Sequence, residues 1–269
     1  MYFVIMWYWL FATTARQASL LYLQKLHHFA GSKSPFNYQP NWSNSYAHFM
    51  QFGECILDKI GGWLVNIHEQ ELQVFGHEYF SQHYQKGALI IVSHFGNIEL
   101  LRAIKSEHPQ KINVLVYQKH ATKFNEFLKN INDKADVCLL SVDELGIETA
   151  MLLQDKMQQG EWVIVAVDRV PVQSDRVQHV DFLGESAAFP QGAWILANLL
   201  KVPVIAVFCY RVQQQFQVHI HSIAEQINLP RANRIESMQT ITKTYVAVLE
   251  QHCLRAPYQW FNFYNFWTK

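Results

Sequence analysis

Short apolar runs recur along this chain from residue 72 onward, and they constrain its fold more than any other feature. The runs cover residues 72–75, 88–92, 112–117, 137–140, 162–167 and 202–208, with helical candidates between most of them. Parallel strands covered on both faces read as continuous apolar runs, and helical crossovers join them. The sequence therefore predicts an α/β fold with a mostly parallel central sheet flanked by helices.

The remaining segments predict helices on either side of this region. Residues 1–30 and about 46–64 have helical character, with a loop at 31–44, and residues 235–254 form a final amphipathic helix. Apolar and polar side chains alternate over residues 216–221, which predicts an edge strand half in water. We expect two parts: a hydrophobic, membrane-associating helix at 1–30 and an α/β domain at 31–269.

The amino-terminal segment is unusually aromatic. Residues 1–15 carry no acidic or lysine side chain and include Tyr2, Phe3, Trp7, Tyr8, Trp9 and Phe11. A helix of that length spans roughly 22 Å, short of the roughly 30 Å hydrocarbon core of a bilayer. Because dense Trp and Tyr suit the headgroup boundary, we favour an anchor embedded in the membrane surface over a buried first helix. The segment lacks the basic leader and cleavage site of a signal peptide.

Composition narrows the classes of partner. The 22 Lys and Arg residues equal the 22 Asp and Glu residues, so net charge gives no argument for nucleic-acid binding. The four cysteines lie far apart, with no CxxC pair, and are typical of reduced thiols in a cytoplasmic protein. His219 and His221 would face the same way on a strand, but without a third ligand nearby we predict no metal site.

The residues that carry the chemistry follow the run 88–92. His94 comes soon after it, Gly96 permits a turn, and Asn97 can cap a helix whose first turn contains Glu99. The amino end of a helix stabilises a carboxylate, so an ionised Glu99 can hydrogen-bond one nitrogen of His94 and stabilise the imidazolium. The pattern predicts a general base, His94, with Glu99 as its orienting partner. The alternative is a capping Asn97, a solvated glutamate and an incidental histidine.

Two further segments are candidates for binding substrate. Asp168 and Arg169 follow the run 162–167, so we expect them at the same sheet edge as His94. A guanidinium there can bind a phosphate or stabilise an oxyanion, although a structural Asp–Arg pair fits equally well. Near Gly192, after a proline at a predicted helix start, backbone N–H groups can bind anionic or carbonyl oxygens, and a plain turn is the simpler interpretation. The candidate substrate-binding residues are Arg169, Asp168, Gly192 and Asn97.

The carboxyl-terminal residues 257–267 concentrate aromatic side chains beyond any packing period. They can wall an acyl-chain groove, seal the core or contact lipid. Sealing the core is the simplest of the three.

Four blocks, taken in order, resemble one known family. His94-Phe-Gly-Asn-Ile-Glu99 is similar to the His-x4-Glu block of the lipid A biosynthesis late acyltransferases, a branch of the lysophospholipid acyltransferase-like superfamily. Asp168-Arg169 resembles that branch's Asp block. The segment from Phe182-Leu-Gly184 to Pro190-Gln-Gly192 resembles its Phe-Gly and Pro-x-Gly block, and Pro257-Tyr-Gln-Trp260-Phe its terminal Pro-x-Gln-Trp-Phe. Arg169, where the branch often has Gln, and the aromatic end look closer to a subgroup associated with aryl polyene lipid pathways.

The resemblance implies an O-acyltransferase at the cytoplasmic face of the inner membrane. Its donor would be a thioester of acyl carrier protein, or less often of coenzyme A, and its acceptor a hydroxyl of a lipid or glycolipid. No other cofactor is implied. In this interpretation His94 removes the acceptor's proton, Glu99 orients His94, and Arg169 with backbone donors near Gly192 binds phosphate or the oxyanion.

Two other classes stay open. A thioester hydrolase would use the same base on water. A non-catalytic, membrane-associated lipid-binding protein would need neither His94 nor Glu99.

Overall fold

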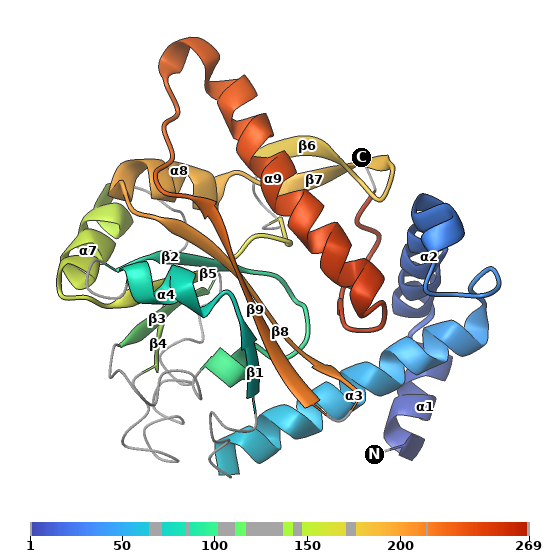
Figure 1. Cartoon of the computed structure of the whole chain (residues 1–269). Coiled ribbons are helices and arrows are strands. Elements are labelled where there is room, and N and C mark those ends of the chain that lie inside the picture. Colours follow the sequence, from blue (N-terminus) through green and yellow to red (C-terminus); the bar gives the residue numbers. More distant parts are fainter. Residues whose placement is uncertain are drawn as a thin grey trace.

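A seven-stranded sheet lies at the centre of the part of the chain that the computed structural model describes, residues 2–64, 72–83, 87–101, 111–116, 137–141, 147–170, 176–213 and 215–267 (Figure 1). The strand order is β1-β9-β8-β2-β5-β3-β4. The bounds are β1 (Leu72–Phe75), β2 (Leu89–Val92), β3 (Ile112–Val116), β4 (Val137–Ser141), β5 (Trp162–Ala166), β8 (Val204–Val212) and β9 (Gln215–Ala224). Strands β8, β2, β5, β3 and β4 are parallel, and β9 runs antiparallel to β8. The predicted α/β class with a mostly parallel sheet is confirmed.

Strand β2 shows why the apolar runs are continuous. Leu89 and Ile91 belong to one hydrophobic core, whereas Ile90 and Val92 belong to a second core on the opposite face. Successive side chains of a strand point to opposite faces, so a strand between two cores is apolar at every position. The sequence predicts helices on both faces of the sheet for the same reason, because each apolar face has to be covered.

The helices group at distinct parts of the sheet. Their bounds are α1 (Tyr2–Phe11), α2 (Thr13–Ala30), α3 (Trp42–Leu64), α4 (His77–His83), α7 (Ile147–Gln158), α8 (Gly192–Leu200) and α9 (Arg234–Arg255), with short 3-10 turns η1 (Gly31–Lys33), η3 (Ile98–Leu100) and η5 (Arg231–Asn233). Figure 1 shows α1 and α2 at one side, with α2 against α3 and against the end of α9, and α3 running from them along the bottom of the view toward β1. None of the described helices is both long and apolar enough to cross a bilayer.

The helix bounds differ from the sequence prediction at two places. The predicted helix 1–30 is divided at Ala12 into α1 and α2, and α3 begins at Trp42, inside the predicted loop 31–44. The Asn41 side chain accepts hydrogen bonds from the backbone N–H and the hydroxyl of Ser43, so it satisfies a donor at the start of α3.

The prediction of a half-exposed edge strand at 216–221 is wrong. Strand β9 lies inside the sheet, between β8 and β1, and His219 on it is buried. The edge position belongs to the four-residue β1, which pairs with β9 in parallel register. Polar side chains on β9 are therefore enclosed by neighbouring aromatic rings, such as Phe75 stacked on His219, and not by water.

A β-hairpin was missing from the sequence prediction. Strands β6 (Val177–Phe182) and β7 (Glu185–Pro190) pair antiparallel beside α9, so Pro190 ends a strand and α8 begins only at Gly192. The connecting residues Leu183 and Gly184 both have positive φ angles, 54° and 84°. A two-residue connection with positive φ at both positions matches the twist of paired strands and makes a tight hairpin.

Candidate active site

Two adjacent parallel strands bring His94 and Asp168 together. In the register of β2 and β5, Val92 is opposite Ala166, and each candidate residue follows two positions later. The backbone N–H of His94 donates to Oδ2 of Asp168 at 2.7 Å. The imidazole Nδ1 lies 2.8 Å from Oδ1 of the same carboxylate. The sequence placed both residues at one sheet edge, and the structure shows that they are direct partners.

The environment of Asp168 keeps its carboxylate ionised. The residue has no solvent exposure. Burial by itself raises the pKa of a carboxyl group, but the charge and hydrogen bonds of His94, together with a hydrogen bond from Trp260, hold the pKa of Asp168 below its ordinary value. An ionised carboxylate accepts hydrogen bonds only, so Nδ1 of His94 carries a proton and donates it to Oδ1.

This contact fixes the chemistry available to His94. With Nδ1 protonated, the neutral ring has its lone pair on Nε2, which is the atom that can accept a proton. The side chain of His94 is 36% exposed, so it is accessible from outside the protein. A histidine with one nitrogen held by a buried carboxylate has the arrangement of a general base with its orienting partner.

The carboxyl-terminal segment, residues 256–267, returns from α9 to complete this site. The backbone N–H of Phe261 donates to the carbonyl of His94 at 2.7 Å, and the N–H of Gly96 donates to the carbonyl of Gln259 at 2.8 Å. The hydroxyl of Tyr264 donates to the carbonyl of Asp168 at 3.1 Å. These contacts clamp the loop after β2 and the loop after β5 to the same segment.

The Trp260 contact with Asp168 had no local signal in the sequence. The indole Nε1–H donates to Oδ2 at 3.0 Å, across 92 residues of chain. The sequence names Trp260 as part of the terminal aromatic block and of the Pro-x-Gln-Trp-Phe block, and neither pattern predicts a contact with Asp168. The same holds for Phe261, whose backbone contact with His94 the block does not predict.

Glu99 lies within η3, close after the turn, as the sequence pattern requires. Its side chain is outside the described part of the structure, so its predicted contact with His94 stays a prediction. Nδ1 of His94 is already the partner of Asp168.

Arg169 is exposed beside the pair. One of its terminal nitrogens lies 3.5 Å from the carbonyl oxygen of Phe261, a long hydrogen bond that leaves the guanidinium accessible. A cation at this place can contact an anionic group that approaches His94.

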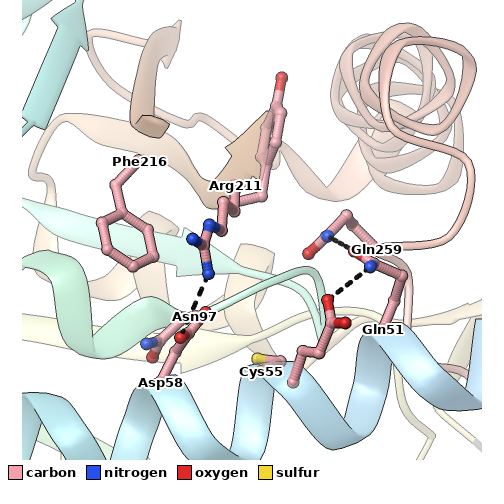
Figure 2. A pocket seen from close by; sticks show the side chains of 9 residues that line it. Gln51, Cys55, Asp58, Asn97, Arg211, Phe216 and Gln259 are labelled. Carbon is pink, nitrogen blue, oxygen red and sulfur yellow. Dashed lines mark hydrogen bonds and ion pairs between the residues drawn. The ribbon is translucent and has the colours of Figure 1, made fainter. Parts of the chain in front are cut away.

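Asn97 lies on a neighbouring polar pocket between α3 and the ends of β8 and β9 (Figure 2). The backbone N–H of Asn97 donates to the carbonyl of Cys209 at 2.6 Å. In the pocket Arg211 faces Asp58 at 3.6 Å. Burial raises the pKa of Asp58 although the charge of Arg211 opposes that shift. His94 is not one of the residues that line this pocket.

Gly192 lies at the first turn of α8, next to the β6–β7 hairpin. The preceding Gln191 is hydrogen-bonded to the start of β6. Its backbone N–H donates to the carbonyl of Arg176, and its side-chain amide donates to the carbonyl of Val177. The structure therefore gives Gly192 a defined place at a helix start, and its role toward substrate stays a prediction.

Within the described ranges, no three His, Cys, Asp or Glu side chains converge as metal ligands do. His219 and His221, the pair considered in the sequence, instead meet His252 of α9, with Nε2 of His221 2.9 Å from Nε2 of His252.

Comparison with known proteins adds one match. The family model described as bacterial lipid A biosynthesis acyltransferase matches residues 47–269, which is most of the chain. No curated protein matches the chain.

Proposed function

The chain belongs to the bacterial lipid A biosynthesis acyltransferase family, and from this premise we propose that it transfers a fatty acyl group from a thioester to a hydroxyl of a lipid or glycolipid acceptor, with His94 as general base. The family supports acyl transfer to a lipid acceptor. The single observation that supports the site is the hydrogen bond from Nδ1 of His94 to the buried Asp168 carboxylate, which leaves the lone pair of the neutral ring on Nε2.

The proposed reaction balances without a covalent enzyme intermediate. Nε2 of His94 accepts the proton of the acceptor hydroxyl as its oxygen attacks the thioester carbonyl carbon. The carbon–oxygen bond forms, the carbon–sulfur bond breaks, and the imidazolium returns the proton to the leaving thiolate. The reaction needs no cofactor beyond the acyl donor, which is acyl carrier protein thioester in our proposal, with coenzyme A thioester as the alternative.

Asp168 takes the orienting role in this proposal. Its carboxylate holds Nδ1–H and stabilises the positive charge that His94 gains during the reaction. The sequence assigned that role to Glu99 and assigned Asp168 to substrate. Since Nδ1 already has a carboxylate partner, we keep Glu99 as a candidate catalytic residue whose contact with His94, if made, is to the other nitrogen or to the reacting groups.

Substrate binding is proposed at three further residues. The exposed guanidinium of Arg169 is suited to a donor or acceptor phosphate or to the oxyanion of the attacked carbonyl. Backbone donors near Gly192 are the second candidate, and Asn97, on its polar pocket, is the third. Arg169 next to Asp168 also supports the finer prediction of the subgroup associated with aryl polyene lipids.

We further propose that the protein works on the cytoplasmic face of the inner membrane, with α1 in contact with lipid. Phe3, Trp7 and Phe11 of α1 expose 81%, 63% and 66% of their surface. An uncharged helix that exposes aromatic side chains is suited to the headgroup boundary. Since the basic and acidic residues are equal in number, net charge gives no reason to include nucleic acid among the proposed partners.

Transfer assays on purified full-length protein test the chemistry. The donor is the lauroyl thioester of acyl carrier protein, the acceptor is a detergent-dispersed lipid extract from a strain that lacks this protein, and mass spectrometry identifies the products. We expect acylated lipid from the wild-type protein and a loss of about 10²–10⁴-fold for His94→Ala. Near-normal transfer by a folded His94→Ala variant would remove His94 from the proposal.

Two matched isosteric variants decide which carboxylate orients the base. Asp168→Asn and Glu99→Gln each remove one negative charge with little change in shape. A larger loss of kcat in Asp168→Asn supports the assignment made here, and a loss confined to Glu99→Gln returns the role to Glu99. Free laurate as the main product, in place of acylated lipid, would indicate a thioester hydrolase.

A further inference from the structure

The orientation of the buried Asp168 carboxylate is set by its hydrogen-bond donors. Oδ1 meets Nδ1 of His94, while Oδ2 accepts from the backbone N–H of His94 and from the indole of Trp260. Two of these three donors belong to the residue that the carboxylate has to orient. Among the described residues, the Trp260 indole is the side-chain donor that fixes the carboxylate from outside His94.

The Trp260 indole is itself held rigidly. Its side chain is fully buried. Four aromatic rings meet it edge to face, with centroid distances of 4.9 Å to Tyr22, 5.1 Å to Phe182, 5.3 Å to Phe266 and 6.4 Å to Trp267. A ring enclosed in this way cannot rotate without moving the surrounding core, so the direction of its N–H is fixed.

The backbone of Trp260 is tied to the helices that precede the sheet. Nε2 of His48, on α3, lies 2.9 Å from the Trp260 carbonyl oxygen, and Nδ1 of His48 lies 3.0 Å from the hydroxyl of Ser19 on α2. Burial lowers the pKa of His48 to about 3, so the ring is neutral. A carbonyl can only accept, so Nε2 carries the proton and Nδ1 accepts from Ser19.

A second tie lies one residue earlier, at the edge of the pocket in Figure 2. The side-chain amide of Gln259 donates to Gln51 of α3 at 2.7 Å, and Gln51 donates to Glu54 at 2.7 Å. The carbonyl of Gln259 meanwhile accepts from Gly96. Helix α3 therefore hydrogen-bonds to the same carboxyl-terminal segment, residues 256–267, that hydrogen-bonds to the loop containing His94.

We propose that Trp260 is a positioning residue for the reaction: its indole N–H holds the Asp168 carboxylate so that Oδ1 faces Nδ1 of His94, and α2 and α3 fix Trp260 through Ser19 and His48. The inference rests on the proposed function, because it assigns how the proposed base is aligned. Trp260 does not contact substrate in this role.

The test replaces one atom group and keeps the ring shape. Benzothienylalanine, in which sulfur replaces the indole N–H, is incorporated at position 260 of the full-length chain by codon suppression. The same replacement at position 267 is the matched control, because the Trp267 indole lies in the same cluster but donates to the carbonyl of Phe182 at 3.0 Å. Transfer is assayed with lauroyl acyl carrier protein and the lipid extract described above.

We expect the variant at 260 to lose kcat by about tenfold, with KM for the donor within twofold, and the variant at 267 to keep both. Removing a donor from a carboxylate raises its pKa, so activity of the variant at 260 should fall away at a higher pH on the acidic side of the profile. Equal effects at 260 and 267, or an unchanged pH profile at 260, would overturn the proposal.

A second readout does not depend on activity. The Nδ1–H proton of His94 is followed by NMR and assigned by its loss in His94→Ala. We expect it to shift, or to exchange faster with water, when the indole N–H at 260 is removed and not when that at 267 is removed. An unchanged signal at 260 contradicts the positioning role. A changed signal in a protein whose wild type transfers no acyl group contradicts the proposed function alone.

Discussion

At the scale of single residues, Gly96 shows how closely the site is built. Its φ angle is +60°, and a Cβ placed on it would lie 2.0 Å from the carbonyl oxygen of Cys209 and 2.7 Å from the Cβ of Tyr210. The turn after His94 therefore depends on the absence of a side chain, both for its conformation and for its contact with β8.

Gly96→Ala should accordingly destabilise the protein by about 2–4 kcal/mol, because backbone atoms of β8 have to move. Gly160→Ala is the matched control: its φ angle is +78°, but a Cβ there meets no atom within 4 Å. That variant carries the conformational cost alone, about 1 kcal/mol. Urea unfolding of both variants measures the difference, and equal losses would show that the close approach to β8 is unimportant.

At the scale of single residues, local sequence predicts where a residue lies in the fold better than it predicts which residue it contacts. His94 and Asp168 were both placed at one sheet edge because each follows an apolar run. Their pairing depends on the register between β2 and β5, which no short segment encodes. Equal offsets of the two residues from their strand ends were the available signal. The Trp260 contact depends on the path of a segment 92 residues away from Asp168, so no spacing rule could find it.

At the scale of elements, β9 and α9 enclose a group of neutral histidines. The ring of His252 on α9 stacks on Phe208, with 4.2 Å between the centroids, and its Nδ1 lies 2.9 Å from the hydroxyl of Tyr210. Burial, followed by the neighbouring His219, His221 and Arg255, lowers the pKa of His252 to about 2. Burial likewise lowers the pKa of His219 to about 4.

These shifts predict a protein that loses stability in mild acid. In the unfolded chain these histidines take up protons near pH 6.5, while the folded state keeps them neutral to lower pH. The unfolded state then binds more protons, so stability is fully present above about pH 6.5 and falls as the pH drops toward 4. For each such histidine, the free energy of unfolding falls by about 1.4 kcal/mol per pH unit as the pH drops through that window.

Thermal unfolding at pH 7.5, 6.5, 5.5 and 4.5 checks this expectation. The melting temperature should be nearly constant over the first interval and should fall over the later ones. His48→Gln removes one of the buried histidines, since its pKa in the folded state is about 3, and should flatten the dependence by about one proton. A melting temperature independent of pH down to 4.5 would mean that the histidines are not held neutral.

The same elements explain what the sequence missed. Alternation of Phe216, Val218 and Ile220 with polar residues normally indicates one wet face. Here the polar face of β9 meets α9 and the ring of Phe75, so polar atoms are satisfied by one another, as in the hydrogen bond between His219 and Gln217 at 3.1 Å. The burial of β9 depends on packing against distant elements, which a local sequence pattern does not predict.

At the scale of the whole molecule, the exposed aromatic side chains gather on the first helix. Helix α1 contacts α2 and α3, and the Trp9 indole donates to Ser45 of α3 at 3.2 Å, so one side of α1 packs on protein while other side chains are exposed. The family match begins at residue 47 and does not include this helix.

If α1 contacts lipid, Phe3→Glu should weaken binding to vesicles of phosphatidylethanolamine and phosphatidylglycerol by about tenfold or more, because a charge would enter the boundary region. Ile235→Glu is the matched control, since Ile235 is 77% exposed but lies at the start of α9. Vesicle sedimentation compares the two. Equal binding of both variants would reject α1 as the lipid contact.

The return of the carboxyl-terminal segment also determines when during synthesis this protein becomes competent. His94 and its loop leave the ribosome long before residues 259–261, which have to cross the loop and lock the carboxylate in place. Until then a nascent chain has its histidine but not the alignment that the finished chain has. Contacts between such distant positions also form late in folding, because closing a long loop costs entropy before it brings any gain. If the chain works as proposed, acyl transfer therefore begins only after almost all of the described chain has been made.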